Sequence, residues 1–228
     1  MTDKTCTWLK ILKDDMWQIT EKIALLYWQP FPGCSTPYFN YRFEHVKHVE
    51  KIAMKLFAKY GGDEDIILAA VWTHDRTKFE EGNHAKTGSE WILQNLAQTG
   101  FPEHKVKDVA YAISMHNGWE PREIKTIEGK ILYDADKLSK FGPAAFLDTI
   151  FRNTSKKICE RDAEWKNNAM QFHETISMGN FLDRLSGFKN VDHSGYDKTF
   201  NFEESLKLLD KYTHATKAFF EALEEQLT

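Results

Sequence analysis

Six histidine and aspartate residues in the middle of the chain have side chains that could bind a metal ion. They are His45, His74, Asp75, His84, His116 and Asp136. Each lies within a segment whose sequence predicts a helix, or close to the end of one. Imidazole and carboxylate groups suit Mn, Fe, Zn or Ni, and also Mg where carboxylates and water dominate. Helices that each contribute such a side chain to one interior point form a common kind of metal site, so the sequence predicts a metal centre inside a helical bundle.

The adjacent pair His74-Asp75 follows a strongly apolar segment. Neighbouring residues of an α-helix diverge by about 100°, so both can face one target only if the helix loosens there. Taken alone, the pair is better explained by a helix-capping aspartate and a packed histidine than by a metal site. An imidazole and an ionised carboxylate buried together without an ion would be costly, whereas a divalent cation offsets that cost.

The elements that must position these residues are predicted to be helices. Apolar residues recur three or four positions apart and no run of alternating β-branched residues is present, so the predicted fold class is all-α. The predicted helices run from about Thr7 to Trp28, Asn40 to Tyr60, Asp63 to Asp75, His84 to Ala97, Glu103 to His116, Thr126 to Ser139, Ala144 to Phe151, Cys159 to Asn180 and Glu203 to Gln226.

Local signals define the ends of these helices. Asn40 and Asp63 are predicted N-caps, and Gly61 can adopt the left-handed conformation that ends a helix. Asn117 to Lys125 and Ser186 to Asn201 are predicted loops. Too few residues follow the second loop to form another core, so we expect one all-helical domain over residues 1–228.

The composition excludes several classes of protein. A chain of 228 residues, 42% of them apolar, can bury a sizeable core without disulfides. Cys6, Cys34 and Cys159 have unrelated spacings, which favours free thiols in a reducing cytoplasm. The apolar run from Ile66 to Trp72 is too short to span a bilayer, and the charged N-terminal segment argues against a signal peptide. A net charge of -4 gives no reason to expect general nucleic-acid or membrane binding.

The order of the candidate ligands resembles the HD superfamily of metal-dependent phosphohydrolases. That family has an early His, a His-Asp pair and a later Asp, matched here by His45, His74-Asp75 and Asp136. The segments that carry the likeness are Tyr41 to Val49, Ile67 to Asp75 and Asp134 to Leu138. The resemblance covers about residues 41–147 and implies an HD-domain-like helical bundle, here with extra N- and C-terminal helices.

The resemblance implies that His45, His74, Asp75 and Asp136 hold one metal ion. Asp136 aligns with the ligand of related members, which leaves Asp134 either as a carboxylate that supports the metal ligands or as a hydrogen-bond partner that faces another helix. The segments from His84 to Gly88 and from Ala112 to Asn117 are similar to parts of two-metal members. His84 and His116 would therefore hold a second ion, with Asp75 bridging.

The reaction implied by the resemblance is hydrolysis of a nucleotide or another small phosphate ester, as a phosphomonoesterase or phosphodiesterase. One or two divalent ions (Mn, Fe, Mg, Ni or Co) would activate a water, which Asp75 or Asp136 could orient. Lys78 stands three residues after Asp75, where many members carry a lysine that faces the phosphate. Gly118-Trp119-Glu120-Pro121 departs from the Gly-Tyr-Pro of the HD-GYP branch, so cyclic-dinucleotide hydrolysis is not supported.

Several alternatives remain open at this point. Some members of the superfamily are di-iron oxygenases with the same ligands, and a metal-stabilised sensor could hold a phosphorylated ligand without turnover. Arg42 and Arg76 could bind phosphate or be solvated charges. An aromatic group could wall a base-binding pocket or pack in the core: Trp8, Trp17, Trp28, Tyr38, Phe39, Tyr41 and Phe43. The substrate and the oligomeric state are not determined by the sequence.

Overall fold

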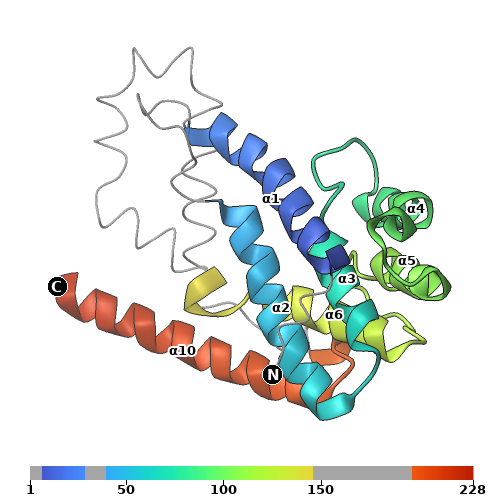
Figure 1. Ribbon diagram of the computed structural model, residues 1–228. Coiled ribbons are helices and arrows are strands. Elements are labelled where there is room, and N and C mark those ends of the chain that lie inside the picture. Colours follow the sequence, from blue (N-terminus) through green and yellow to red (C-terminus); the bar gives the residue numbers. More distant parts are fainter. Residues whose placement is uncertain (1–6, 29–39, 146–196, 228) are drawn as a thin grey trace, which may run out of the picture.

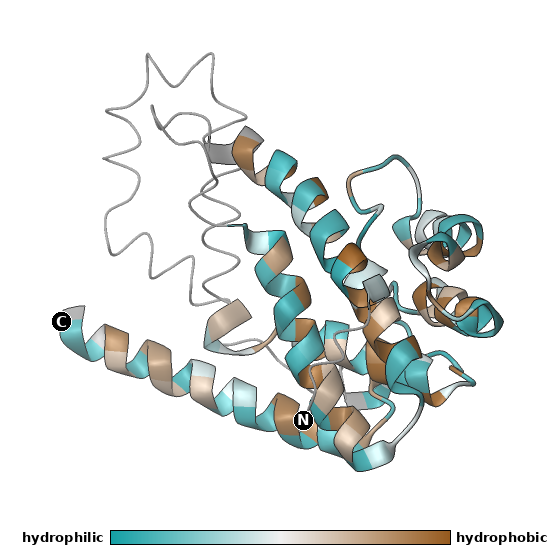
Figure 2. Ribbon diagram, in the orientation of Figure 1, coloured by the Kyte–Doolittle hydropathy of each residue, from teal (hydrophilic) through white to brown (hydrophobic). Residues whose placement is uncertain are grey.

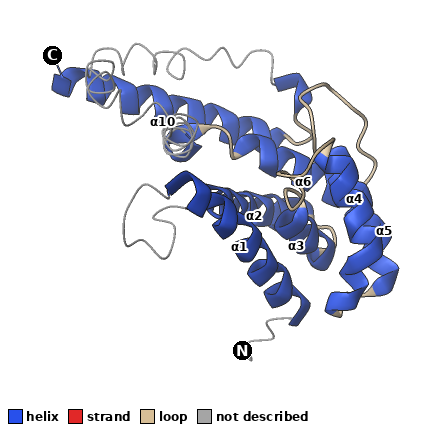
Figure 3. Ribbon diagram, turned by 90° about the horizontal axis from the view of Figure 1, so that it is seen from above, coloured by secondary structure: helices blue, strands red, loops and turns tan. Residues whose placement is uncertain are grey.

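The computed structural model describes residues 7–28, 40–145 and 197–227 (Figure 1). Within these ranges the regular elements are all helices, which confirms the all-α fold class (Figure 3). The α-helices are α1 (Thr7–Trp28), α2 (Tyr41–Tyr60), α3 (Glu64–Thr73), α4 (His84–Asn95), α5 (Val106–Met115), α6 (Ile127–Leu138) and α10 (Glu203–Leu227). The predicted helix from Cys159 to Asn180 lies outside the described residues, as do most of the predicted helix from Ala144 and of the predicted loop from Ser186.

Short polar side chains begin three of these helices, and two of them, Asn40 and Asp63, are the predicted N-caps. The Asn40 side chain accepts a hydrogen bond from the Phe43 amide, and the Asp63 side chain accepts from the amides of Asp65 and Ile66. Thr126 accepts from the Gly129 amide at the start of α6. These bonds satisfy amides that have no partner within the helix, which is why the boundaries of α2, α3 and α6 could be predicted locally.

Two predicted helices differ from the structure at one end. The helix predicted from His84 to Ala97 ends at Asn95 and continues as a 3-10 turn, Leu96–Thr99, before Gly100 adopts a φ of 87°. The helix predicted from Glu103 begins with another 3-10 turn, Glu103–Lys105, and α5 starts only at Val106. Such tighter turns are frequent at helix ends and carry little sequence signal of their own.

The helices pack around one buried layer. α2 lies against α3 and α6, α5 packs against α3, α4 and α6, and α1 covers α2 and α3 (Figure 1). Polar and apolar residues alternate around the helices, as expected when each has one buried face (Figure 2). The core includes Val49 and Leu56 of α2, Ile67 of α3, Ile113 of α5 and Ile131 of α6. None of the helices that the structure describes is both long and apolar enough to cross a membrane.

The N-terminal end of α10 is fixed against α2 and α6. The Asp134 carboxylate of α6 accepts hydrogen bonds from the Asn201 backbone amide at 3.0 Å, the Asn201 side chain at 2.7 Å and the Phe202 amide at 3.1 Å. The Tyr60 ring stacks on Phe202 with centroids 4.2 Å apart, and Lys59 pairs with Glu204. From this anchor α10 extends away from α4 and α5 (Figures 1 and 3).

Candidate metal centre

The six candidate ligands lie together in space, in two groups of three. His45, His74 and Asp136 form one group, named here the buried cluster. Asp75, His84 and His116 form the other, named the rim cluster because His84 is its most exposed member. Within each cluster, one ligand atom from each residue lies within 4.8 Å of the others. Each cluster therefore has the composition and size to hold a metal ion.

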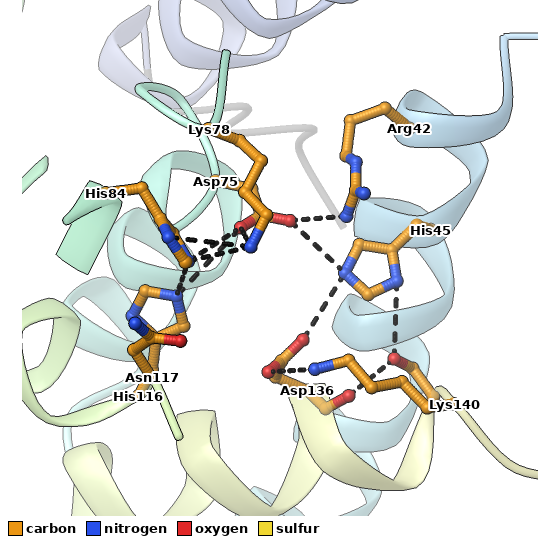
Figure 4. Close-up of a pocket in the computed structure, with 10 residues that line it drawn as sticks. Arg42, His45, Asp75, Lys78, His84, His116, Asn117, Asp136 and Lys140 are labelled. Atoms are coloured by element: carbon orange, nitrogen blue, oxygen red, sulfur yellow. Dashed lines mark hydrogen bonds and ion pairs between the residues drawn. The ribbon is translucent and has the colours of Figure 1, made fainter. Parts of the chain in front are cut away.

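The Asp75 carboxylate connects the two clusters (Figure 4). Its Oδ2 lies 3.6 Å from Nε2 of both His45 and His74, in the buried cluster. Its Oδ1 lies 3.5 Å from His84 Nε2 and 4.0 Å from His116 Nε2, in the rim cluster. One oxygen atom thus faces each cluster, which is the arrangement that a bridging carboxylate needs.

The end of α3 allows His74 and Asp75 to face the same space. The α-helix ends at Thr73, and the next residues form turns in which the Arg76 amide bonds to the Thr73 carbonyl and the Lys78 amide to the Asp75 carbonyl. A continuing helix would have sent the two side chains about 100° apart. The prediction that the helix must loosen at this pair is confirmed.

Hydrogen bonds at Nδ1 orient three of the four candidate imidazoles. His74 Nδ1 lies 2.7 Å from the Val71 carbonyl, and His116 Nδ1 lies 2.6 Å from the Ile113 carbonyl. Since a carbonyl only accepts, both Nδ1 atoms carry hydrogen and both Nε2 lone pairs face the clusters. For His45, Nδ1 lies 3.3 Å from the Ser139 hydroxyl, which donates its own hydrogen to the Asp136 carbonyl. In metal sites, a hydrogen bond at the second ring nitrogen of a histidine fixes the tautomer and orientation of the ring, and these histidines show the same pattern.

Two of these lone pairs also provide a test of whether a metal fits. Nε2 of His45 and Nε2 of His74 are buried and have no hydrogen-bond partner among the residues that the structure describes. A buried polar atom without a partner is costly. A cation between His45, His74 and Asp136 would satisfy both nitrogen atoms, so the buried cluster fits a metal ion.

The protonation states also suit metal binding. Burial lowers the pKa of His45 and His84 to about 4 and that of His116 to about 3. Burial alone would raise the pKa of Asp75 and Asp136, but Arg42 beside the first and Lys140 beside the second hold both pKa values well below the usual range. Near neutral pH these imidazoles are neutral and the carboxylates ionised, which are the forms that bind metal.

Three cationic side chains line the same pocket, which has a volume of about 270 Å³. Arg42 donates to Asp75 Oδ2 at 2.6 Å, Lys140 donates to Asp136 Oδ2 at 2.8 Å, and Lys78 Nζ lies 3.1 Å from His84 Nε2. Asn117 and Ser139 complete the polar lining (Figure 4). The pocket thus combines metal-binding groups with positive charge that could bind an anion.

Of the other candidate residues, the structure brings Lys78 and Arg42 to the pocket but not Arg76. Arg76 Nε donates to Asp15 at 2.7 Å, and its guanidinium lies 3.9 Å above the Trp91 ring. The interpretation of Arg76 as a phosphate ligand is therefore wrong, because its guanidinium group pairs with Asp15 and packs on the Trp91 ring. The Asp134 carboxylate accepts hydrogen bonds from Asn201 and Phe202 at the start of α10, which fits the predicted alternative of a hydrogen-bond partner that faces another helix.

Of the aromatic candidates described on α1 and α2, Trp8 and Tyr41 are buried, Phe43 is partly buried against the core, and Trp17 is 37% exposed. Trp8 meets Phe101 edge to face at 4.9 Å, and Phe43 contacts Trp17 at 4.9 Å and Trp72 at 5.4 Å. Among the described residues that line the pocket, none is aromatic. The interpretation of these rings as a base-binding wall is wrong for the part of the chain described. The Trp28 side chain, Tyr38 and Phe39 lie outside it.

Four residues near the site were not assigned a role from the sequence. They are Asn117, Lys137, Ser139 and Lys140. Lys137 is buried and donates to the His116 carbonyl at 2.8 Å and to Asp136 Oδ2 at 3.0 Å, so it connects one ligand of each cluster. Lys140 follows Asp136 by four residues, a helical pairing distance that could have identified it. No comparable signal marks Ser139.

A comparison with protein families identifies the central part of the chain. Residues 42–140 match the family model of the HD domain. This chain contains an HD domain. All six candidate ligands, Arg42, Lys78 and Lys140 lie within the matched HD domain. The N-terminal α1 and the C-terminal α10 lie outside it.

Two solved structures are similar to this chain in fold, with matches that extend beyond the HD domain. An HD-superfamily hydrolase from Bacillus thuringiensis is 17% identical, with a TM-score of 0.50, and the match covers 94% of this chain and 98% of that one. YpgQ from Bacillus subtilis, crystallised with ADP, is 14% identical with a TM-score of 0.53, and the match covers 96% of both chains. At such identities the likeness concerns the fold. A search of curated proteins found no match.

The Ser139 hydroxyl provides a direct test of how the HD domain orients His45. Replacing Ser139 by Ala removes the acceptor for His45 Nδ1, so the ring loses its fixed tautomer and orientation. We expect the affinity of the tighter metal site to fall by about 10-fold or more, within the range typical of outer-shell changes. Titration calorimetry with Mn²⁺ measures this. Exposed Ser114 is the matched control, and Ser114→Ala should leave the affinity unchanged.

Proposed function

We propose that this protein is a metal-dependent phosphohydrolase that acts on a nucleotide or another small phosphate ester. One observation carries the proposal. The two clusters share a pocket with Arg42, Lys78 and Lys140, so groups suited to divalent cations lie beside groups suited to a multiply charged anion. Phosphate is the substrate chemistry that uses both kinds of group at once.

The six candidate ligands would hold two metal ions. His45, His74 and Asp136 would hold one ion, and His84 and His116 a second, with the Asp75 carboxylate between them. Divalent ions held by these residues would supply a bound water of lowered pKa and would neutralise phosphoryl oxygens.

The other groups of the pocket would act on the anion and on the water. Arg42, Lys78 and Lys140 would attract and position the phosphate through charge-assisted hydrogen bonds. An oxygen of Asp75 or Asp136 would accept a hydrogen bond from the attacking water and orient it. The catalytic assignment is therefore Asp75 for the water and Lys78 for the phosphate.

A nucleotide is the first substrate to test. The structurally similar YpgQ was crystallised with ADP, so a nucleotide fits at least one protein of this fold. The described part of the pocket offers charged and polar contacts to phosphate and no aromatic surface for a base. We therefore expect the phosphate groups to contribute more to binding than the base does.

The test is a screen of metal-loaded protein for phosphate release. Purified protein is supplied with Mn²⁺, Mg²⁺, Ni²⁺, Co²⁺ or Fe²⁺ and offered nucleoside mono-, di- and triphosphates and generic mono- and diesters. We expect metal-dependent release that is lost in His74→Ala. The exposed His104 provides a matched control, and His104→Ala should retain activity.

Two other outcomes would contradict hydrolysis, and a third would contradict the assignment of the metal site. Iron-dependent oxygen uptake without phosphate release would favour the di-iron oxygenase. Tight binding of a nucleotide without turnover by any metal form would favour the sensor. Full metal content in both His74→Ala and Asp136→Ala would show that the site itself is assigned wrongly.

A further inference from the structure

The two clusters differ in how the candidate nitrogen atoms are engaged. In the buried cluster, Nε2 of His45 and Nε2 of His74 have no hydrogen-bond partner within the described part of the chain. In the rim cluster, His84 Nε2 lies 3.1 Å from the Lys78 ammonium and 3.2 Å from His116 Nε2. The His84 nitrogen atom that faces the other rim ligands thus already lies at hydrogen-bond distance from a cation of the protein itself.

The position of Lys78 places its charge at the rim cluster and not at the buried one. Its Nζ lies 3.9 Å from Asp75 Oδ1, the same oxygen that faces His84 and His116. The other two cations of the pocket contact different oxygen atoms. Arg42 donates to Asp75 Oδ2, and Lys140 donates to Asp136 Oδ2. Figure 4 shows Lys78 on the side of Asp75 that faces His84.

We propose that the Lys78 ammonium occupies the rim cluster in place of a second metal ion, so that the buried cluster fills first and the rim cluster fills only when Lys78 is displaced. The inference rests on the proposed metal-binding function. A divalent ion at the rim cluster must take the place of the Lys78 ammonium beside His84 Nε2 and must also overcome repulsion from that like charge a few ångströms away. At the buried cluster Arg42 and Lys140 also place positive charge near the ion, but no protein cation lies at hydrogen-bond distance from Nε2 of His45 or of His74 within the described part of the chain.

Displacement of Lys78 would connect metal loading to substrate binding. While Lys78 is bound to His84, its ammonium has fewer donors available for a phosphate oxygen. Once a second ion releases it, the same ammonium can turn toward the anion in the pocket. Lys78 would thus serve as a positioning and charge-balancing residue in the singly loaded protein and as a phosphate ligand in the doubly loaded one.

The test is titration calorimetry of the metal-free full chain with Mn²⁺, supported by metal analysis after dialysis. We expect the wild type to bind one ion tightly and a second one weakly. Lys78→Met preserves length but removes the charge, and it should strengthen the second step by about 10-fold or more without changing the first. Lys78→Arg retains the charge and should keep the second step weak.

An exposed lysine near the same cluster is the matched control. Lys86 lies on α4 two residues after His84 and pairs with Glu90 at the surface. Lys86→Met removes the same charge without touching either cluster, so both binding steps should stay as in the wild type. A comparable gain in Lys86→Met would overturn the proposal by showing that overall charge, and not the place of Lys78, sets the affinity.

The failure of this inference differs from a failure of the proposed function. If the wild type binds two ions and Lys78→Met leaves the second step unchanged or weaker, Lys78 does not compete for the rim cluster and only the inference is overturned. If the wild type binds no ion of any metal tested, the metal-dependent function is overturned and the inference with it.

Discussion

Asp75→Asn is expected to lower kcat for phosphate release by at least about 1,000-fold, equivalent to about 4 kcal/mol of transition-state stabilisation. Asp75 is 4% exposed, and its two oxygen atoms face different clusters. The amide keeps the shape of the side chain but replaces one charged oxygen atom with an NH₂ group that cannot bind a cation. Steady-state kinetics with Mn²⁺, together with metal analysis, would measure the effect.

The metal content separates this role from a general loss of structure. We expect Asp75→Asn to retain less than the wild-type complement of metal while its far-ultraviolet circular dichroism remains that of a helical protein. Asp108 is an exposed carboxylate of α5, and Asp108→Asn should leave both kinetics and metal content unchanged. Activity of Asp75→Asn within about tenfold of the wild type would exclude a bridging role.

Asp134→Asn is expected to give the largest loss of stability. The Asp134 carboxylate is fully buried and both of its oxygen atoms accept hydrogen bonds from the segment that begins α10. An amide can offer only one acceptor, so its NH₂ group would face the donors of Asn201 or Phe202. We expect the free energy of unfolding to fall by about 2–3 kcal/mol at pH 7.5, with faster hydrogen exchange at the start of α10.

The loss in free energy of unfolding caused by Asp134→Asn, called the penalty below, should also depend on pH. Burial raises the pKa of Asp134 from 3.8 to about 6, although its hydrogen bonds oppose that shift. A raised carboxyl pKa in the folded state gives stability that is present below the unfolded-state pKa and is lost as pH rises through about 6. The amide does not titrate, so the penalty should grow by about 2 kcal/mol from pH 7.5 to pH 4.5.

Urea unfolding of both proteins across this pH range would measure the difference. Asp210 lies on α10 and is exposed, so Asp210→Asn is the matched control and should show little penalty at either pH. A penalty that is larger at pH 7.5 than at pH 4.5 would mean that the donors from Asn201 and Phe202 stabilise the ionised carboxylate more than burial disfavours it.

The helix boundaries near the site were predictable because local chemistry determines them. Asn40, Asp63 and Thr126 each bind amides two or three residues away, so the signal and its effect lie in the same short segment. The same holds for the break at His74, where the requirement that two adjacent side chains face one target predicts the end of α3.

Contacts between distant segments account for what the sequence did not predict. Arg76 has no feature that distinguishes it from Arg42, and only the fold places Asp15 and Trp91 beside it. Ser139 acquires its role because α2 brings His45 next to the end of α6, a contact between residues 94 positions apart. Asp134 likewise meets Asn201 across 67 positions. Local patterns carry no information about such partners.

The directions of the helices give the centre an electrostatic field of its own. The carboxyl end of a helix carries a partial negative charge and the amino end a partial positive one. α3 and α5 end immediately before His74 and His116, and α6 ends two residues after Asp136, so three negative ends meet at the clusters. α4 begins at His84, and α2 begins one residue before Arg42. Cations would therefore be drawn toward one set of helix ends and anions toward the other, so a substitution that frays α5 should weaken metal binding even with every ligand intact.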